Sequence, residues 1–265
     1  MIGYEDVLSE KALALGLAWA RRYHAQVIVA HVSSSQMSES KEVEILESLQ
    51  SVLQHQKENS YFKSYPPKVI GQVAEKASTG LVQLAHQHRA SLIVLATHGR
   101  TGDDRVRHGS VAEEVLKDAP CPVLIGQERE KVVDVFHPQV IAVPIDFSPF
   151  AYRAIAHSII LSKDFGSHLY LFHAHEEPYL NDVNEKQKLQ DMMAQMNWQT
   201  IDHELVVESG DVATGLVDFA ATYQADLIVM GTHRVDYNAH TYANSLTSEV
   251  IARAPCPVLV VHPEG

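Results

Sequence analysis

The segment Ala96–Val111 holds the residues of this chain best suited to bind an anion. It contains Gly99 and Gly109, and Ser110 directly precedes an expected helix. Glycine lets backbone N–H groups approach an anion closely, and the first turn of a helix has N–H groups without intrahelical partners. Three arginines add positive charge: Arg100, Arg105 and Arg107. This order of residue types favours a phosphate-binding loop; the alternative is that the glycines only form turns before a helix.

Two copies of one pattern make up the chain. Ala119–Leu124 recurs 135 residues later as Ala254–Leu259, whereas His31 recurs 142 residues later as His173. The copies therefore differ in length by 7 residues, in the middle of each copy. So many matches at one offset predict two homologous domains. The predicted boundaries are residues 1–127 for the first domain, 128–138 for a linker and 139–265 for the second domain.

Each copy alternates helical patterns with short apolar runs. In the first copy, apolar residues from Leu8 to Trp19 recur three to four apart, and a helix after residues 39–59 and the strand 68–73 is expected to begin at Ser78 or Thr79. Runs such as Leu92–Leu95 have the length and composition of buried strands. Short apolar strands separated by helices predict an α/β protein with two doubly wound, open parallel-sheet domains.

The two copies open differently. The second copy has the apolar run Val140–Ile145 before its first helix, but the first copy begins almost directly on a helix. We therefore expect the first domain to lack an evident opening strand. Either the true start lies upstream of Met1, or the first domain is incomplete.

Over both copies the chain resembles the universal stress protein family. The ATP-binding pattern of that family is Gly-x2-Gly-x9-Gly-Ser/Thr, followed by a helix and a Pro-Val-Leu-type final strand. The first copy has Gly99, Gly109 and Ser110 at this spacing, with Ala96 in place of the leading glycine. The resemblance implies a Rossmann-like fold of the adenine nucleotide hydrolase type. It also implies that Gly99, Gly109, Ser110 and Val111 hold phosphates and that Ala96 lies near the ribose.

In the second copy the resemblance implies a different set of contacts. Family members that bind nucleotide place an Asp at the end of the opening strand against adenine. The second copy keeps four of the corresponding positions: Pro144, Asp146, Gly231 and Ser245. Arg234 and Asn244 replace two glycines, and a side chain at such a position hinders the approach of phosphate. Arg234 could instead pair with a phosphate or fill the empty pocket. We therefore expect the first copy to be the better nucleotide site.

Composition and charge exclude several classes of partner. The chain has 265 residues and a net charge of −12, of which −1 falls in residues 1–132 and −11 in residues 133–265. An acidic second half repels polyanions, so neither nucleic acid nor an anionic membrane is an expected partner. No run approaches the roughly 18 apolar residues of a membrane span. The two cysteines and the absence of a secretory pattern predict a cytoplasmic protein.

Catalytic and metal sites are not expected. The chain has no Gly-x4-Gly-Lys-Ser/Thr loop, no Gly-x-Ser-x-Gly turn and no His-Glu-x2-His pair, so no catalytic residue is proposed; a slow ATPase activity is left open. His86 and His88 would point to different faces of a helix. His173 and His175 could share a strand face but have no evident third ligand. For Trp198 a packing contact with its helix is favoured over a cofactor contact.

The predicted function is non-catalytic binding of ATP or another adenine nucleotide, without a required metal, in a stress-response protein. The alternative is a protein-interaction module whose pockets no longer bind nucleotide. By resemblance, the final strands Val123–Ile125 and Val258–Val261 would pair within the chain as a pseudo-dimer. A homodimer of chains and unknown protein partners are also compatible with the sequence.

Overall fold

The computed structural model describes residues 2–3, 8–33, 39–54, 60–97, 111–127, 136–175, 182–196, 198, 200–232 and 246–262. The chain divides into two compact units, Met1–Phe136 and His137–Gly265. The division falls within residues 128–138, the segment that the sequence predicts as a linker.

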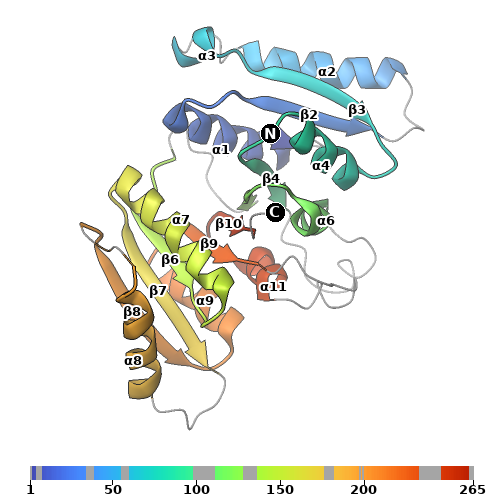
Figure 1. The fold of residues 1–265 in the computed structure, drawn as a ribbon. Coiled ribbons are helices and arrows are strands. Elements are labelled where there is room, and N and C mark those ends of the chain that lie inside the picture. Colours follow the sequence, from blue (N-terminus) through green and yellow to red (C-terminus); the bar gives the residue numbers. More distant parts are fainter. Residues whose placement is uncertain are drawn as a thin grey trace. The chain divides into compact units, whose positions relative to one another are not determined.

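In the first unit the described strands form one parallel sheet in the order β3-β2-β1-β4-β5 (Figure 1). Its elements in chain order are β1 (Ile2–Gly3), α1 (Leu8–Tyr23), β2 (Ile28–Ser33), α2 (Glu39–Gln54), α3 (Ser60–Ser64), β3 (Lys68–Val73), α4 (Ala77–Gln87), β4 (Ile93–Thr97), α6 (Val111–Asp118) and β5 (Val123–Gln127). From β1 the chain steps outward to β2 and β3, and then crosses back to β4 and β5. Right-handed crossovers therefore place α1 and α2 on one face of the sheet and α4 and α6 on the other.

The second unit repeats this architecture, with the order β10-β9-β6-β7-β8. Its elements are β6 (Val140–Pro144), α7 (Pro149–Phe165), β7 (His168–His175), α8 (Asp182–Met193), β8 (His203–Ser209), α9 (Val212–Thr222), β9 (Leu227–Gly231), α11 (Leu246–Arg253) and β10 (Val258–Val261). The central strands carry unbroken apolar runs because both faces of a parallel sheet are covered by helices. Thus Leu227, Ile228 and Val229 of β9 are each fully buried.

The expectation that the first copy lacks an opening strand is corrected by β1. Ile2 pairs with Val29 of β2 and with Val94 of β4, so this two-residue strand occupies the centre of the sheet. In the second unit the partner of Leu171 on β7 is Val143, which makes Ile2 the counterpart of Val143. Two residues are too few to show as an apolar run, but they are enough to bridge the neighbouring strand edges.

The same register changes the comparison of the two copies. If Ile2 corresponds to Val143, then Glu5 corresponds in sequence to Asp146, the acidic residue that follows the opening strand. The first copy therefore has an acidic residue at a position that the sequence comparison treats as missing. Glu5 itself lies outside the described residues.

Close approach of helix to strand explains one repeated glycine. A Cβ added to Gly80 in α4 would lie 2.5 Å from Cγ1 of Val32 in β2. At Gly215, the counterpart in α9, an added Cβ would lie 3.2 Å from the ring of Phe172 in β7. Both glycines therefore allow a helix to pack closely on the adjoining strand.

Helix ends follow capping chemistry in the second unit but not in α4. Ser148 caps α7, where its hydroxyl accepts the N–H of Ala151, and Asp211 caps α9. The prediction that Ser78 or Thr79 caps α4 is wrong: the N-cap residue is Lys76, and its side chain makes no capping hydrogen bond. Ser78 is instead buried within the first turn.

Candidate nucleotide site

In each unit two adjacent strands are followed by connections that leave in opposite directions across the sheet. In the first unit the chain leaves β1 toward β2 on one side and later returns to β4 on the other; β6 and β9 have the same relation in the second unit. Helices that depart to opposite faces leave a crevice at the carboxyl ends of two such strands, and ligands of open α/β sheets bind there. This edge is therefore the candidate site in each unit.

Of the phosphate-loop residues predicted in the first unit, the structure places Ala96 and Val111. Ala96 is the penultimate residue of β4, and Val111 is the first residue of α6. Gly99, Gly109 and Ser110 lie outside the described residues, as does Ser245 in the second unit. The counterpart of Val111 is Leu246, which is likewise the first residue of its helix, α11. Each Ser therefore directly precedes a helix N-terminus that follows the central strand.

Polar contacts link α6 to the start of α4. The hydroxyl of Ser78 donates a hydrogen bond to the Glu114 carboxylate, and Nζ of Lys76 lies 3.0 Å from Oε1 of the same group. The hydrogen bond from Ser78 is the largest cause of a lowered pKa for Glu114, and Lys76 lowers it further. Because Glu114 lies in the first turn of α6, these contacts position the helix end that follows the loop.

The second unit anchors α11 with different residues. One guanidinium nitrogen of Arg253 lies 2.8 Å from Oε1 of Glu249, one turn earlier, and donates to the hydroxyl of Thr214 in α9 at 3.1 Å. Glu249 is the counterpart of Glu114, but its cation comes from its own helix. Both units thus use the same carboxylate position to fix the helix that begins at the candidate site.

Asp146 lies two residues beyond the end of β6, where Pro144 is the last strand residue. One carboxylate oxygen, Oδ1, accepts the backbone N–H of Ser148 at 2.9 Å and also accepts the Ser148 hydroxyl. Asp146 therefore orders the turn that leads into α7. The structure shows no hydrogen bond to its second oxygen among the described residues, and the side chain is exposed.

Phe147, which follows Asp146, and two residues near its ring extend the site beyond the predicted set. The ring of Phe147 is 44% exposed, lies 5.5 Å from the His173 ring, and has Nζ of Lys188 5.7 Å from its centroid. His173 is buried, with Nδ1 2.8 Å from the carbonyl oxygen of Ile145. Since a carbonyl only accepts, Nδ1 carries the hydrogen. A flat exposed ring next to a carboxylate can stack on a planar base while the carboxylate accepts a hydrogen bond.

Phe147 could have been found from its position directly after the strand-end Asp146. Lys188 could not, because it lies more than forty residues away on α8.

Gly231, the last residue of β9, has a packing role that the family pattern does not indicate. A Cβ at this position would lie 2.4 Å from the carbonyl oxygen of Phe150 in the first turn of α7. Glycine is therefore required here by the approach of α7, whether or not a ligand is present. Its counterpart in the first unit is Ala96, which carries the methyl group that Gly231 cannot.

The cysteines lie in the protein core. Cys121 and Cys256 are both buried free thiols, and burial raises the pKa of Cys121 to about 11. Within the described ranges no group of three or more His, Cys, Asp or Glu side chains is placed to hold a metal ion. No helix in the same ranges is long and apolar enough to cross a membrane.

The strand order and its crossovers define a tandem doubly wound α/β protein. The sequence model of the universal stress protein family matches residues 1–126 and again residues 138–262. The chain therefore belongs to the universal stress protein family and contains two copies of its domain.

Two solved structures show the same fold along the whole chain. A universal stress protein of Archaeoglobus fulgidus is similar over 98% of this chain and 94% of its own, with a TM-score of 0.76 and 20% identity. A putative universal stress protein of Pseudomonas aeruginosa is similar over 99% of this chain and 91% of its own, with a TM-score of 0.69 and 15% identity.

Curated relatives match over shorter stretches. A universal stress protein of Methanocaldococcus jannaschii is 47% identical over 51 residues, which are 19% of this chain and 30% of that relative. A putative universal stress protein of Staphylococcus aureus is 41% identical over 58 residues, 34% of its length. The chain thus spans about a third of the curated relatives that it matches.

Proposed function

We propose that this universal stress protein binds an adenine nucleotide such as ATP and retains it without turnover, with the first unit as the better site. The observation that carries the proposal is the start of α6 at Val111, directly after Gly109-Ser110 in the segment that follows strand β4. A helix N-terminus reached through glycine offers backbone N–H donors and a positive dipole end to a phosphate. A cytoplasmic location accords with this function.

The second unit supports only part of such a site. Asp146 and the exposed ring of Phe147 provide groups suited to a base, but Arg234 and Asn244 stand where the family pattern has glycines. The packing of Gly231 against α7 and the hydrogen bonds of Asp146 to Ser148 also give these two residues structural roles. These observations favour a second function for this unit, as an interaction module without nucleotide.

Matched substitutions in the two units test the proposal. Purified protein is denatured and the released nucleotides are identified, and ATP binding is then measured by titration calorimetry. Gly109→Asp places a carboxylate against phosphate and is expected to abolish binding. Asn244→Asp puts a carboxylate at the corresponding position of the second unit and is expected to leave most of the binding intact. Ligand-free protein with no affinity for ATP, ADP or AMP would refute the proposal, and equal losses in both variants would refute the ranking of the two units.

Retention without turnover is tested on the same sample. Bound ATP is expected to be recovered intact after prolonged incubation, and repeated release of ADP would make the protein an ATPase.

The pairing of the final strands within the chain and the assembly of two chains remain predictions. Sedimentation velocity of the full chain measures the assembly.

A further inference from the structure

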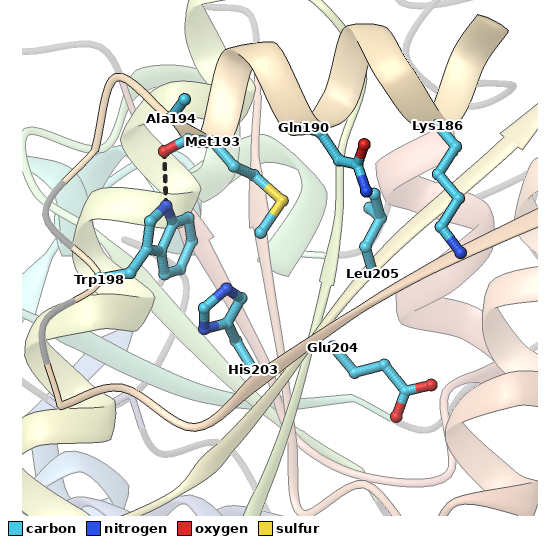
Figure 2. Close-up of a pocket in the computed structure, with 8 residues that line it drawn as sticks. All are labelled: Lys186, Gln190, Met193, Ala194, Trp198, His203, Glu204 and Leu205. Carbon is cyan, nitrogen blue, oxygen red and sulfur yellow. Dashed lines mark hydrogen bonds between the residues drawn. The ribbon is translucent and has the colours of Figure 1, made fainter. Parts of the chain in front are cut away.

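A slot of about 430 Å³ lies between α8 and β8 of the second unit (Figure 2). Its lining consists of Lys186, Gln190, Met193, Ala194, Trp198, His203, Glu204 and Leu205. The last three are the first residues of β8, so the slot lies at the amino end of this strand. The candidate nucleotide site lies at the carboxyl ends of the strands, at the opposite edge of the sheet.

The helix contributes one row of side chains to the slot. Lys186, Gln190 and Met193 are spaced four and three residues apart, which places them on one face of α8. Figure 2 shows these three side chains extending from the helix toward β8, with Lys186 at one end and Met193 near Trp198 at the other. At 1.5 Å per residue, the helix positions of Lys186 and Met193 are about 10 Å apart.

The aromatic end of the slot is held in place by its own contacts. The indole N–H of Trp198 donates to the carbonyl oxygen of Met193 at 2.6 Å. Its ring stacks on His203, with centroids 4.5 Å apart and planes 24° apart. Nδ1 of His203 lies 2.9 Å from the carbonyl oxygen of Ile201 and donates to it. Because both rings are fixed by the protein, a ligand would not have to order them on binding.

The opposite end of the slot is polar. The ammonium of Lys186 and the amide of Gln190 have no hydrogen bond or ion pair to any other described residue, and both side chains are exposed. Glu204 also lines the slot, but it alternates with His203 and Leu205 along β8, and Figure 2 shows its carboxylate extending away from α8. Lys186 is the cation of this lining, and the surrounding half-chain has a net charge of −11, so the slot suits a ligand with a single negative charge and disfavours a polyanion.

We propose that this slot binds a small amphipathic monocarboxylate, with its apolar body against Trp198 and Met193 and its carboxylate at Lys186. The volume falls within the range of roughly 300–1,000 Å³ that is usual for small-molecule sites. The helix positions of Lys186 and Met193 are about 10 Å apart, a distance that an apolar chain of several carbon atoms can span. The amide of Gln190 is available as a second hydrogen-bond donor to the carboxylate of the ligand.

The aromatic residues that form the slot are not repeated in the first copy. The strand register makes Val69 of β3 the counterpart of Leu205, so Trp198 corresponds to Phe62 and His203 to Pro67, and the stacked indole–imidazole pair is not repeated at these positions. Most of the 7-residue difference in length between the copies also falls between β7 and β8, in the segment that supplies α8 and Trp198. The proposed ligand would therefore be bound once per chain, independently of any nucleotide.

Tryptophan emission tests this proposal directly, because the chain has one tryptophan in each unit. In a Trp19→Phe background, Trp198 is the sole tryptophan, and its emission is followed during titration with octanoate. A saturable change is expected with octanoate but not with octylamine, which has the same tail and the opposite charge. Lys186→Met should weaken octanoate binding by roughly two- to fivefold, the usual effect of removing one partner of an exposed ion pair. Lys163→Met, at an exposed lysine of α7, should leave it unchanged.

The outcomes separate this site from the nucleotide site. Gly109→Asp should not alter octanoate binding, so failure of the nucleotide proposal leaves this result intact. Absence of a saturable response to octanoate, an equal response to octylamine, or unchanged affinity in Lys186→Met would each overturn the proposal. Far-ultraviolet circular dichroism confirms that the Lys186→Met variant is folded, since Lys186 is exposed and unpaired among the described residues.

Discussion

Replacing Gly231 with alanine tests whether this glycine serves packing or a ligand. The added Cβ would lie 2.4 Å from the carbonyl oxygen of Phe150, a separation that must open by at least 0.6 Å to reach 3.0 Å, the shortest that real Cβ atoms show. The obstacle is backbone in the first turn of α7, so a rotamer change cannot relieve it. Overpacking of this kind usually costs about 1–3 kcal/mol, and a backbone obstacle favours the upper end of that range.

Urea denaturation followed by Trp198 emission in the Trp19→Phe background measures this cost in the second unit. With a slope of about 1–3 kcal/mol per molar urea, a loss of about 3 kcal/mol lowers the midpoint by roughly 1–3 M. Ala96→Gly, at the matched position of the first unit, should leave the Trp198 transition in place. An unchanged midpoint for Gly231→Ala would show that α7 yields without cost, and the glycine would then need another explanation.

Three further predictions concern capping, helix anchoring and thiol reactivity. Hydrogen bonds from Thr214 lower the pKa of Asp211 below its ordinary 3.8. At pH values above about 4, Asp211→Ala should therefore unfold at a lower urea concentration than the parent protein. The difference between the two urea midpoints should shrink as the pH falls below 3.8. Glu114→Gln should cost the first unit about 1 kcal/mol near neutral pH, after allowance for the exposure of the carboxylate, as measured by Trp19 emission. Since the Glu114 pKa is lowered from 4.5, this cost should diminish as the pH falls below that value; a cost independent of pH would contradict the ionic contact. Burial raises the pKa of Cys121 to about 11, and Cys256 is also buried, so a disulfide reagent at pH 8 should label neither thiol quickly before urea is added and both afterwards.

The architecture was accessible from the sequence because its signals are local. A strand covered by helices on both faces needs an unbroken apolar run, and an amphipathic helix needs apolar residues three to four apart. Both patterns occur twice at nearly constant offsets, so the α/β class and the two copies follow from the printed residues alone. The strand β1 was missed because two residues carry no periodicity, and only pairing of Ile2 with Val29 and Val94 reveals it.

The candidate site also has features that the sequence predicts and features that only the structure shows. Position after a strand and before a helix is a property of the chain order, so Asp146, Val111 and their neighbours could be proposed from sequence. The packing role of Gly231 could not, because it depends on Phe150, some eighty residues earlier, approaching within 2.4 Å. The amphipathic slot likewise requires α8, Trp198 and the start of β8 to meet. Spacing along a chain determines which faces residues share, but distances between elements arise only when those faces pack together.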